Sequence, residues 1–218
     1  MKLFVTGTDT GVGKTFVTTA IAQACVAAGK SVLAWKPIET GCDIVAGRLF
    51  GADAEALAHA AGNWQTGHLR GMYFYQKPAA PYVAAVDQGS PPPNPTEIAK
   101  VVAGAGQNVV LVEGAGGLRV PVDQSTDMAN LAKACALPVL LVARAGLGTI
   151  NHTILSLDAL ASEDLTLAGI VLSRTADVAP AIAASNKSEI ERLRGKSVHV
   201  FDGTDSIVLL NYLATARL

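Results

Sequence analysis

The sequence predicts an α/β protein with a doubly wound, mostly parallel sheet and helices on both faces. Three continuous apolar runs indicate the sheet, because a strand covered on both faces shows no polar side. The runs are VVLV, PVLLVA and AGIVL, at 109–112, 138–143 and 168–172. Helical segments separate them, and strands that alternate with helices are typical of a parallel sheet.

The first half of the chain carries shorter elements. We expect strands at 3–5, 31–35 and 72–75, and helices at 14–28, 52–61 and 96–103. Gly29 ends the first helix, and Asn94 or Thr96 caps the last. Pro78, Pro81 and the run SPPPNP at 90–95 break the chain around a short segment, which we interpret as a surface excursion.

The second half continues the alternation to the end of the chain. Helices are expected at 128–136, 150–161 and 179–194, followed by an edge strand at 198–201 and a closing helix at 207–216. The sequence contains no internal repeat and no linker, so we expect residues 1–218 to form one domain.

Composition restricts the class of protein. Half of the residues are apolar and 16% are charged, which is too apolar for a disordered chain. The net charge of −1, without a basic run, argues against nucleic-acid binding, and no apolar run reaches the length of a membrane span. Cys25, Cys42 and Cys135 have no C-x-x-C spacing, and no charged-then-apolar leader is seen. We therefore expect a cytoplasmic protein with reduced thiols.

The stretch FVTGTDTGVGKTFV, at 4–17, leads from a strand into a helix through glycines. It resembles the phosphate-binding pattern G-x-x-x-x-G-K-[ST]. Gly7 precedes Gly13 by six positions rather than five, and Thr8 holds the usual glycine place. Inward N–H groups and the positive end of the helix would stabilise a polyphosphate there. We call residues 7–15 the phosphate loop.

Side chains of this loop suit a magnesium–triphosphate. Lys14 would lie against the β- and γ-phosphates, and Thr15 would offer its hydroxyl to Mg²⁺. Thr10 either faces the γ-phosphate or supports the turn. Such a loop makes the protein P-loop NTPase-like.

Loops at the carboxyl ends of parallel strands converge on one site. Lys36 directly follows the strand at 31–35. It is either a surface lysine in a turn or, beside the phosphate loop, a cation that faces the transferring phosphate or an anionic substrate. Asp53 begins a helix, and it either caps that helix or lies beside Mg²⁺; spacing does not separate these roles.

Two further loops carry polar or glycine-rich stretches. Glu113 ends a buried strand before GAGG, and its hard oxygens suit a second Mg²⁺ ligand facing Thr15; a solvated strand-end glutamate is the alternative. LGTINHT, at 147–153, turns from strand into helix with Thr149 or Asn151 as its cap, where free N–H groups could bind a carboxylate. His152 is expected on the helix surface rather than as a base.

The motifs VTGTDTGVGKT, KPIETG, VEGAGGLRVP and LGTINHT, with KPAAP at 77–81, resemble dethiobiotin synthetases in order and spacing across residues 1–175. The resemblance implies a ligase that uses ATP, Mg²⁺, CO₂ or bicarbonate, and 7,8-diaminononanoate. One amine forms a carbamate, which attacks the γ-phosphate to give a carbamic–phosphoric anhydride. The second amine then closes the cyclic urea and releases phosphate.

The resemblance also implies roles for individual residues. The catalytic residues are Thr10, Lys14 and Lys36, and the metal ligands are Thr15, Asp53 and Glu113. The nucleotide is held by Gly11, Val12, Gly13, Lys14, Thr15, Phe16, Asp53, Glu113, Gly114, Ala115, Gly116, Ser173 and Arg174. The substrate contacts Thr40, Pro78, Gly148, Thr149, Ile150 and Asn151. The family is a homodimer, in which the acid end of the diamine lies near 148–151 of the neighbouring subunit.

Two departures from the family pattern concern the base of the nucleotide. Ser173 and Arg174 stand where the family often has asparagine, whose amide can donate and accept at once, unlike a serine hydroxyl. We therefore expect nucleotides other than ATP to be used. The residues after Arg194 are fewer than expected and lack a G-x-I-P turn, so base contacts of that region are not carried over.

Three rival classes fit less well. A cobyrinate amide synthetase should carry a glutaminase domain, for which 218 residues leave no room. Partition or site-selection ATPases typically show GKGGVGKT, with a second lysine where this chain has Asp9. A nucleotide-binding subunit without chemistry would leave Lys36 and Glu113 without a purpose.

Overall fold

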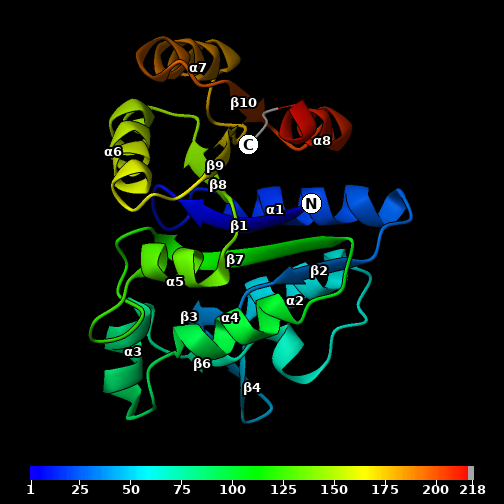
Figure 1. Cartoon of the computed structure of the whole chain (residues 1–218), viewed down its shortest axis with the longest axis vertical. Helices are drawn as coiled ribbons and strands as arrows, with labels where there is room; N and C mark the ends of the chain where they lie inside the picture. Colours follow the sequence, from blue (N-terminus) through cyan, green and yellow to red (C-terminus); the bar gives the residue numbers. More distant parts are fainter. Residues whose placement is uncertain (216–218) are drawn as a thin grey trace.

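A six-stranded, wholly parallel sheet forms the centre of the protein (Figure 1), seen in a computed structural model that describes residues 1–215. Its strand order is β10-β9-β8-β1-β7-β2. The strands are β1 (Lys2–Gly7), β2 (Val32–Trp35), β7 (Val109–Gly117), β8 (Val139–Arg144), β9 (Leu167–Ser173) and β10 (Val198–Phe201). The predicted fold class is confirmed, and β10 is the edge strand that the sequence indicated.

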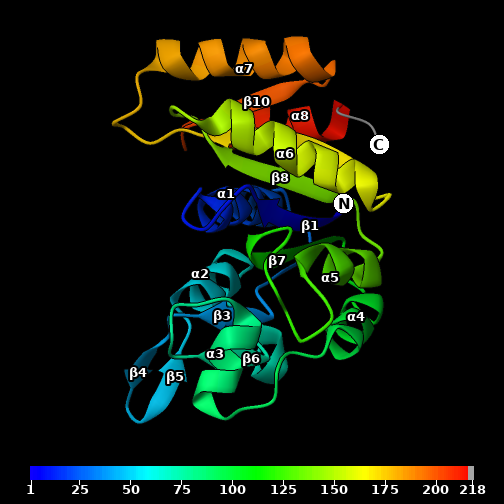
Figure 2. The ribbon, with the colours of Figure 1, turned by 90° about the vertical axis from the view of Figure 1, so that its left-hand side faces the viewer.

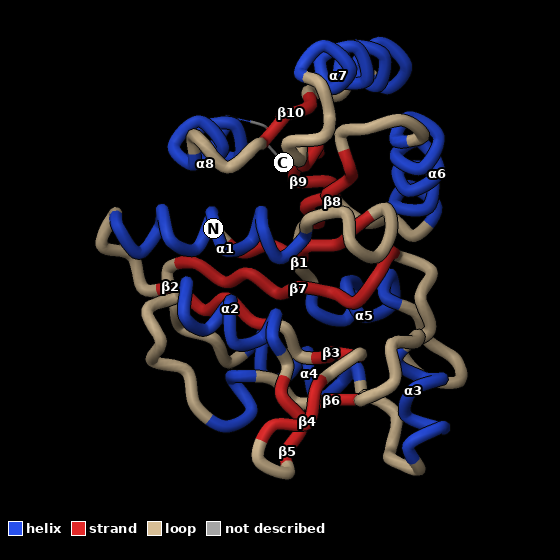
Figure 3. Tube along the Cα trace, turned by 180° about the vertical axis from the view of Figure 1, so that it is seen from behind, coloured by secondary structure: helices blue, strands red, loops and turns tan. Residues whose placement is uncertain are grey.

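Helices cover both faces of this sheet (Figure 3). One face carries α1 (Lys14–Ala27), α2 (Ala52–Ala60) and α8 (Ser206–Thr215), and the other carries α4 (Pro95–Ala103), α5 (Met128–Cys135), α6 (Thr149–Ser162) and α7 (Pro180–Arg194). Phe4 packs into the core that contains α5 residues, whereas its neighbours Leu3 and Val5 pack into the core beneath α1. Successive strand residues point to opposite faces, so a strand buried on both faces reads as a continuous apolar run.

Residues 38–88 form an excursion beside the β2 edge of the sheet (Figure 2). Besides α2, it contains two small sheets, a 3₁₀ turn and a second helix: β3 (Ile38–Thr40) with β6 (Tyr73–Tyr75), β4 (Asp43–Val45) with β5 (Arg48–Phe50), η1 (Gly67–Arg70) and α3 (Pro81–Gln88). The predicted strand at 72–75 exists, but it pairs with β3. The sequence did not predict β3, β4 or β5, because three residues are too few to show a period.

Most predicted element boundaries lie within two residues of those observed, with two informative differences. β7 extends through Gly117 because the glycines after Glu113 stay paired with β1, where Gly7 lies opposite Gly117. The expected caps of α6 were wrong: its N-cap is Gly148, in a left-handed conformation and without a side-chain cap. Asn94 does cap α4, accepting from Thr96 N at 2.9 Å. Residue 216, expected in the last helix, lies outside the described residues.

No helix in residues 1–215 is both long enough and apolar enough to cross a bilayer.

The three cysteines are buried and free, and we predict that none reacts with Ellman's reagent in the folded protein. Burial raises the pKa of all three thiols, to about 11 at Cys42 and about 12 at Cys135. Since thiolate is the reactive form, all three should react only after denaturation. Protonated thiols favour the folded state below pH 9, and that stabilisation should be lost as the pH rises towards 12. Rapid reaction of any cysteine with the reagent in the folded protein would contradict the burial of the three thiols.

Candidate active site

The phosphate loop joins β1 to α1 through glycines with left-handed backbone conformations. The φ angles are 70° at Gly11 and 95° at Gly13, values that favour glycine. A Cβ at Gly13 would also collide with the Ser173 side chain. Gly13 is the N-cap of α1 and provides no side-chain cap. The first N–H groups of α1 therefore face the loop, which is the geometry that binds anions.

The ammonium of Lys14 lies inside this loop. Its side chain is buried, and its Nζ donates to the Asp9 carbonyl at 2.9 Å. Burial lowers the pKa of Lys14 to about 8, although the Glu113 carboxylate opposes that shift. An ammonium has three donors, and the Lys14 Nζ makes only one hydrogen bond among the described residues. It is thus able to bind an anionic ligand.

Lys36, Asp53 and Glu113 form an ion-pair cluster next to the loop. The Lys36 Nζ contacts the Asp53 carboxylate on α2, and it lies 3.0 Å from Glu113 Oε1 on β7. Burial by itself would lower the pKa of Lys36, but the carboxylates of Glu113 and Asp53 outweigh burial and hold that pKa above its ordinary value. Lys36 therefore stays charged at neutral pH.

Glu113 has the donor set of a metal ligand. It is completely buried, and its Oε1 accepts from Thr15 Oγ1 at 2.7 Å. Its Oε2 is buried and has no hydrogen-bond partner among residues 1–215. An orphaned buried oxygen is costly unless a cation or donor binds it. With Asp53 and the Thr15 hydroxyl nearby, these hard oxygens fit Mg²⁺, which commonly takes one or two carboxylates together with phosphates.

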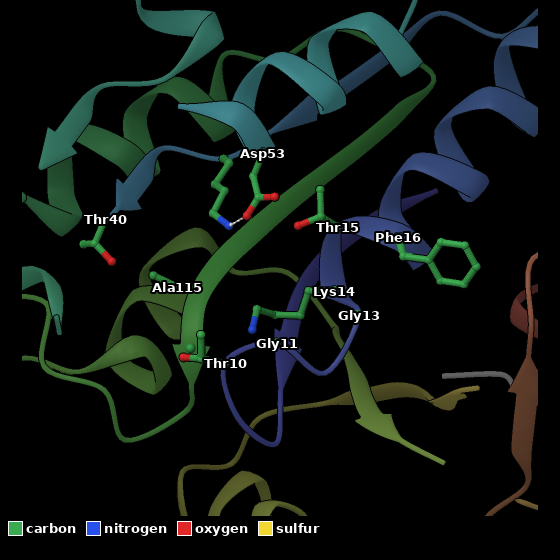
Figure 4. A pocket seen from close by; sticks show the side chains of 11 residues that line it. Thr10, Gly11, Gly13, Lys14, Thr15, Phe16, Thr40, Asp53 and Ala115 are labelled. Carbon is green, nitrogen blue, oxygen red and sulfur yellow. Dashed lines mark hydrogen bonds and ion pairs between the residues drawn. The ribbon is translucent and has the colours of Figure 1, made fainter. Parts of the chain in front are cut away.

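A cavity of about 310 Å³ lies over this cluster (Figure 4). Lys14, Thr15 and Asp53 point towards it, whereas the ring of Phe16 points away from it and packs against Phe201 on β10. The cavity is lined by Thr10, Gly11, Gly13, Lys14, Thr15, Phe16, Lys36, Thr40, Asp53, Ala115 and Gly116. Eleven residues from four separate stretches of the chain, all predicted to be functional, are thus brought together.

A second cavity, of about 620 Å³, shares Gly11, Gly13 and Phe16 with the first. It is also lined by Val12, Ser173 and Arg174, the residues expected on the base side. Arg174 is held by Asp202, at 2.7 Å, and by the carbonyl of Val178, at 3.2 Å. The two cavities adjoin, and the one on the expected base side is the larger.

Other predicted residues lie outside these two cavities. Gly114 faces Phe4 and Met128 in the core. Pro78 packs beside Gly41, next to Thr40. Residues 148–151 form the start of α6 and line neither cavity. The preceding residues Gly146 and Leu147 do line the second cavity, together with Gly11 and Gly13 of the phosphate loop.

The sequence did not reveal Glu39, which is buried behind Asp53. Its carboxylate accepts from Asp53 N at 2.9 Å and from Ala54 N at 2.8 Å. The alternative that Asp53 caps α2 was therefore wrong: the N-cap position is Gly51, and Glu39 takes the N–H groups. The acidic residue in KPIETG was the available signal, but its partners lie 14 and 15 residues further on and spacing does not identify them.

The strand–phosphate loop–helix unit, together with the adjoining lysines and carboxylates, defines a P-loop nucleotide-binding protein. A family model described as an AAA domain matches residues 1–198. The ATP-dependent dethiobiotin synthetase BioD of Anaeromyxobacter dehalogenans (strain 2CP-C) is 44% identical, over 88% of this chain and 84% of that protein. The protein of the same name from Aromatoleum aromaticum is 38% identical, also over 88% and 84%. The chain belongs to the dethiobiotin synthetase family of ATP-dependent enzymes.

Solved structures agree on the fold alone. The MinC:MinD cell division protein complex of Aquifex aeolicus contains a chain that matches with a TM-score of 0.52 and 15% identity. The match covers 99% of this chain and 86% of that one.

Proposed function

We propose that this enzyme closes the cyclic urea of dethiobiotin from 7,8-diaminononanoate and CO₂, with ATP as the phosphoryl donor. The observation that carries the proposal is the convergence of Lys14, Lys36, Thr15, Asp53 and Glu113 on one cavity beside the phosphate loop. The relatives are named ATP-dependent dethiobiotin synthetases, which supports this reaction, and the cavity contains groups suited to it.

The chemical difficulty is that two anions must meet. One amine of the substrate forms a carbamate with CO₂, and a carbamate oxygen attacks the γ-phosphorus while the bond to ADP breaks. The second amine then attacks the carbamoyl carbon, the ring closes and phosphate leaves. Lys14 and Lys36 lower the repulsion between carbamate and triphosphate, and preorganised charge of this kind is worth several kcal/mol. No protein nucleophile is required.

The other residues position the reactants. The N–H groups of residues 11–16 hold the triphosphate, with Thr10 at its terminal end and 113–116 alongside. Thr40 lines the same cavity and faces the carbamate or the diamine. Thr15, Asp53 and Glu113 would hold Mg²⁺, which when bound neutralises charge on the phosphates. Holding the reactants in line supplies much of the remaining acceleration.

The enzyme is proposed to work as a cytoplasmic homodimer, with the diamine at the subunit interface and its acid end near 148–151 of the neighbouring subunit. Two features support this. Residues 148–151 line neither of the two cavities of their own chain, and Gly148, the N-cap of α6, provides no side-chain cap. Thr149 N donates to the Gly146 carbonyl, whereas the N–H groups of Ile150 and Asn151 have no partner among residues 1–215 and are available to a carboxylate. The free cysteines fit a reducing compartment.

Phosphate release with MgATP and bicarbonate tests the proposed function directly. Turnover should require the diamine and should yield a cyclic urea. A monoamine analogue that lacks the second amine is the matched control, because it is able to form a carbamate but not the ring. Phosphate release at the same rate with and without the diamine would contradict the proposed reaction.

CTP or GTP should support measurable turnover in place of ATP. Ser173 is buried against Gly13, and Arg174 is held by Asp202 and Val178. Neither side chain offers the paired donor and acceptor of an amide towards a purine edge. The measurement is cyclic urea formed at saturating concentrations of each triphosphate, and strict dependence on ATP would count against the prediction.

A further inference from the structure

Glu39 holds the start of α2 from another element. The first N–H groups of a helix have no partner within the helix, and a side chain at the N-cap usually binds them. Here the N-cap residue is Gly51, which has no side chain, and Glu39 on β3 accepts from Asp53 N and Ala54 N instead. Glu39 is buried, so these contacts are made away from solvent.

The surroundings of Glu39 leave no room for a cap in the usual place. A Cβ at Gly51 would lie 2.5 Å from Glu39 Oε2 and 2.5 Å from the ring of Phe74. Gly51 is therefore the residue that lets the carboxylate approach the helix. The arrangement depends on the fold of residues 38–54, with β3 beside the start of α2.

The position of Asp53 depends on this arrangement. Within the described residues, the Asp53 carboxylate bonds only to Lys36, and its side chain is 43% exposed. Its backbone N–H, by contrast, is fixed by Glu39 at 2.9 Å. Glu39 thus binds the backbone of the helical turn from which the Asp53 side chain projects.

We propose that Glu39 is a positioning residue that acts through Asp53: it holds the first turn of α2 so that the Asp53 carboxylate lies beside Lys36 and Glu113. The inference rests on the proposed function, because it gives Asp53 the role of a metal ligand. A helix cap with no further role would affect stability and leave cation binding unchanged.

The test is a double-mutant cycle with Mn²⁺ as the probe. Binding of Mn²⁺ to the protein with β,γ-methylene-ATP is followed by electron paramagnetic resonance for the wild type, Glu39→Gln, Asp53→Ala and the double variant. Glu39→Gln should weaken Mn²⁺ binding about tenfold, the loss typical of residues that orient metal ligands. In the Asp53→Ala background, Glu39→Gln should weaken Mn²⁺ binding by less than about twofold, because the carboxylate that Glu39 positions is gone.

Glu191→Gln is the matched control. Glu191 also accepts a backbone N–H, from Val198 at 2.9 Å, and it pairs with Lys187, but it lines neither cavity. It should lower thermal stability and leave Mn²⁺ binding unchanged. If Glu39→Gln does not fold, Glu39→Asp enters the same cycle, since its shorter carboxylate cannot reach both N–H groups.

The outcomes separate the two proposals. An equal loss of Mn²⁺ affinity in both backgrounds, or a lower melting temperature with unchanged Mn²⁺ affinity, overturns the positioning role. A wild-type complex that binds no Mn²⁺ overturns the metal site of the proposed function, and with it this inference. A loss of Mn²⁺ affinity that occurs only when Asp53 is present supports both proposals.

Discussion

Replacing Lys36 with alanine is expected to abolish formation of the cyclic urea, with a loss of at least about 10²–10³-fold, the range seen when one preorganised charge-stabilising group is removed. Two of its three donors bind Asp53 and Glu113, so the third remains for the terminal phosphoryl. Since we propose that the phosphate loop provides most contacts to the triphosphate, nucleotide affinity should change by less than about tenfold.

Steady-state turnover and equilibrium binding of a fluorescent nucleotide measure the two quantities separately. Lys133→Ala is a suitable control, because that lysine is exposed and its Nζ bonds only to the Glu163 carbonyl within residues 1–215. Lys36→Met should be compared as well, since removing Lys36 leaves the buried Glu113 without its ion pair and lowers stability. Loss of all nucleotide affinity would instead place Lys36 among the binding residues.

Glu113→Gln is expected to cause the second large loss, a fall in turnover of about 10–100-fold or more together with a higher Mg²⁺ requirement. Glu113 accepts from Thr15 and Lys36 through Oε1 and leaves Oε2 without a partner. An amide in its place brings a neutral group and two donors to a position where Lys36 already donates. Hard cations prefer carboxylate oxygen, so the metal should bind more weakly.

Initial rates across a Mg²⁺ titration provide the measurement for Glu113→Gln. Glu97→Gln is the control, since Glu97 accepts from the Tyr73 hydroxyl at the protein surface and lies outside both cavities. An unchanged Mg²⁺ requirement in Glu113→Gln would show that Glu113 is not a metal ligand. Thermal melts of both variants separate loss of fold from loss of metal.

The central sheet and most of its helices could be predicted from the sequence because periodicity reports burial directly. The runs at 109–112, 138–143 and 168–172 are strands, since each is covered on both faces. Residues 38–50 could not be predicted, because three-residue strands are stabilised by tertiary pairing and carry no pattern of their own. The same limit applied to Glu39, whose partners lie on another element.

The candidate site could be predicted where its residues lie at the carboxyl ends of parallel strands, because ligands bind at that edge of such a sheet. Lys14 and Lys36 lie after the strands β1 and β2, and Glu113 lies in the carboxyl half of β7 between them, so their convergence follows from topology. The N-cap of α6 was mispredicted because that position is Gly148, whose left-handed backbone favours glycine and which has no side chain to act as a cap. The substrate role that we propose for residues 148–151 requires a second subunit, and the sequence pattern of one chain does not specify how two subunits pack.

A crystal structure with Mg²⁺ and β,γ-methylene-ATP tests most directly whether Lys14 and Lys36 together surround the terminal phosphoryl group. The Nζ atoms of Lys14 and Lys36 should both lie within about 3 Å of the terminal phosphoryl oxygens. If the Lys36 Nζ remains bound to Asp53 and Glu113 alone, and the terminal phosphoryl lies further away than one bridging water can span, the account is contradicted.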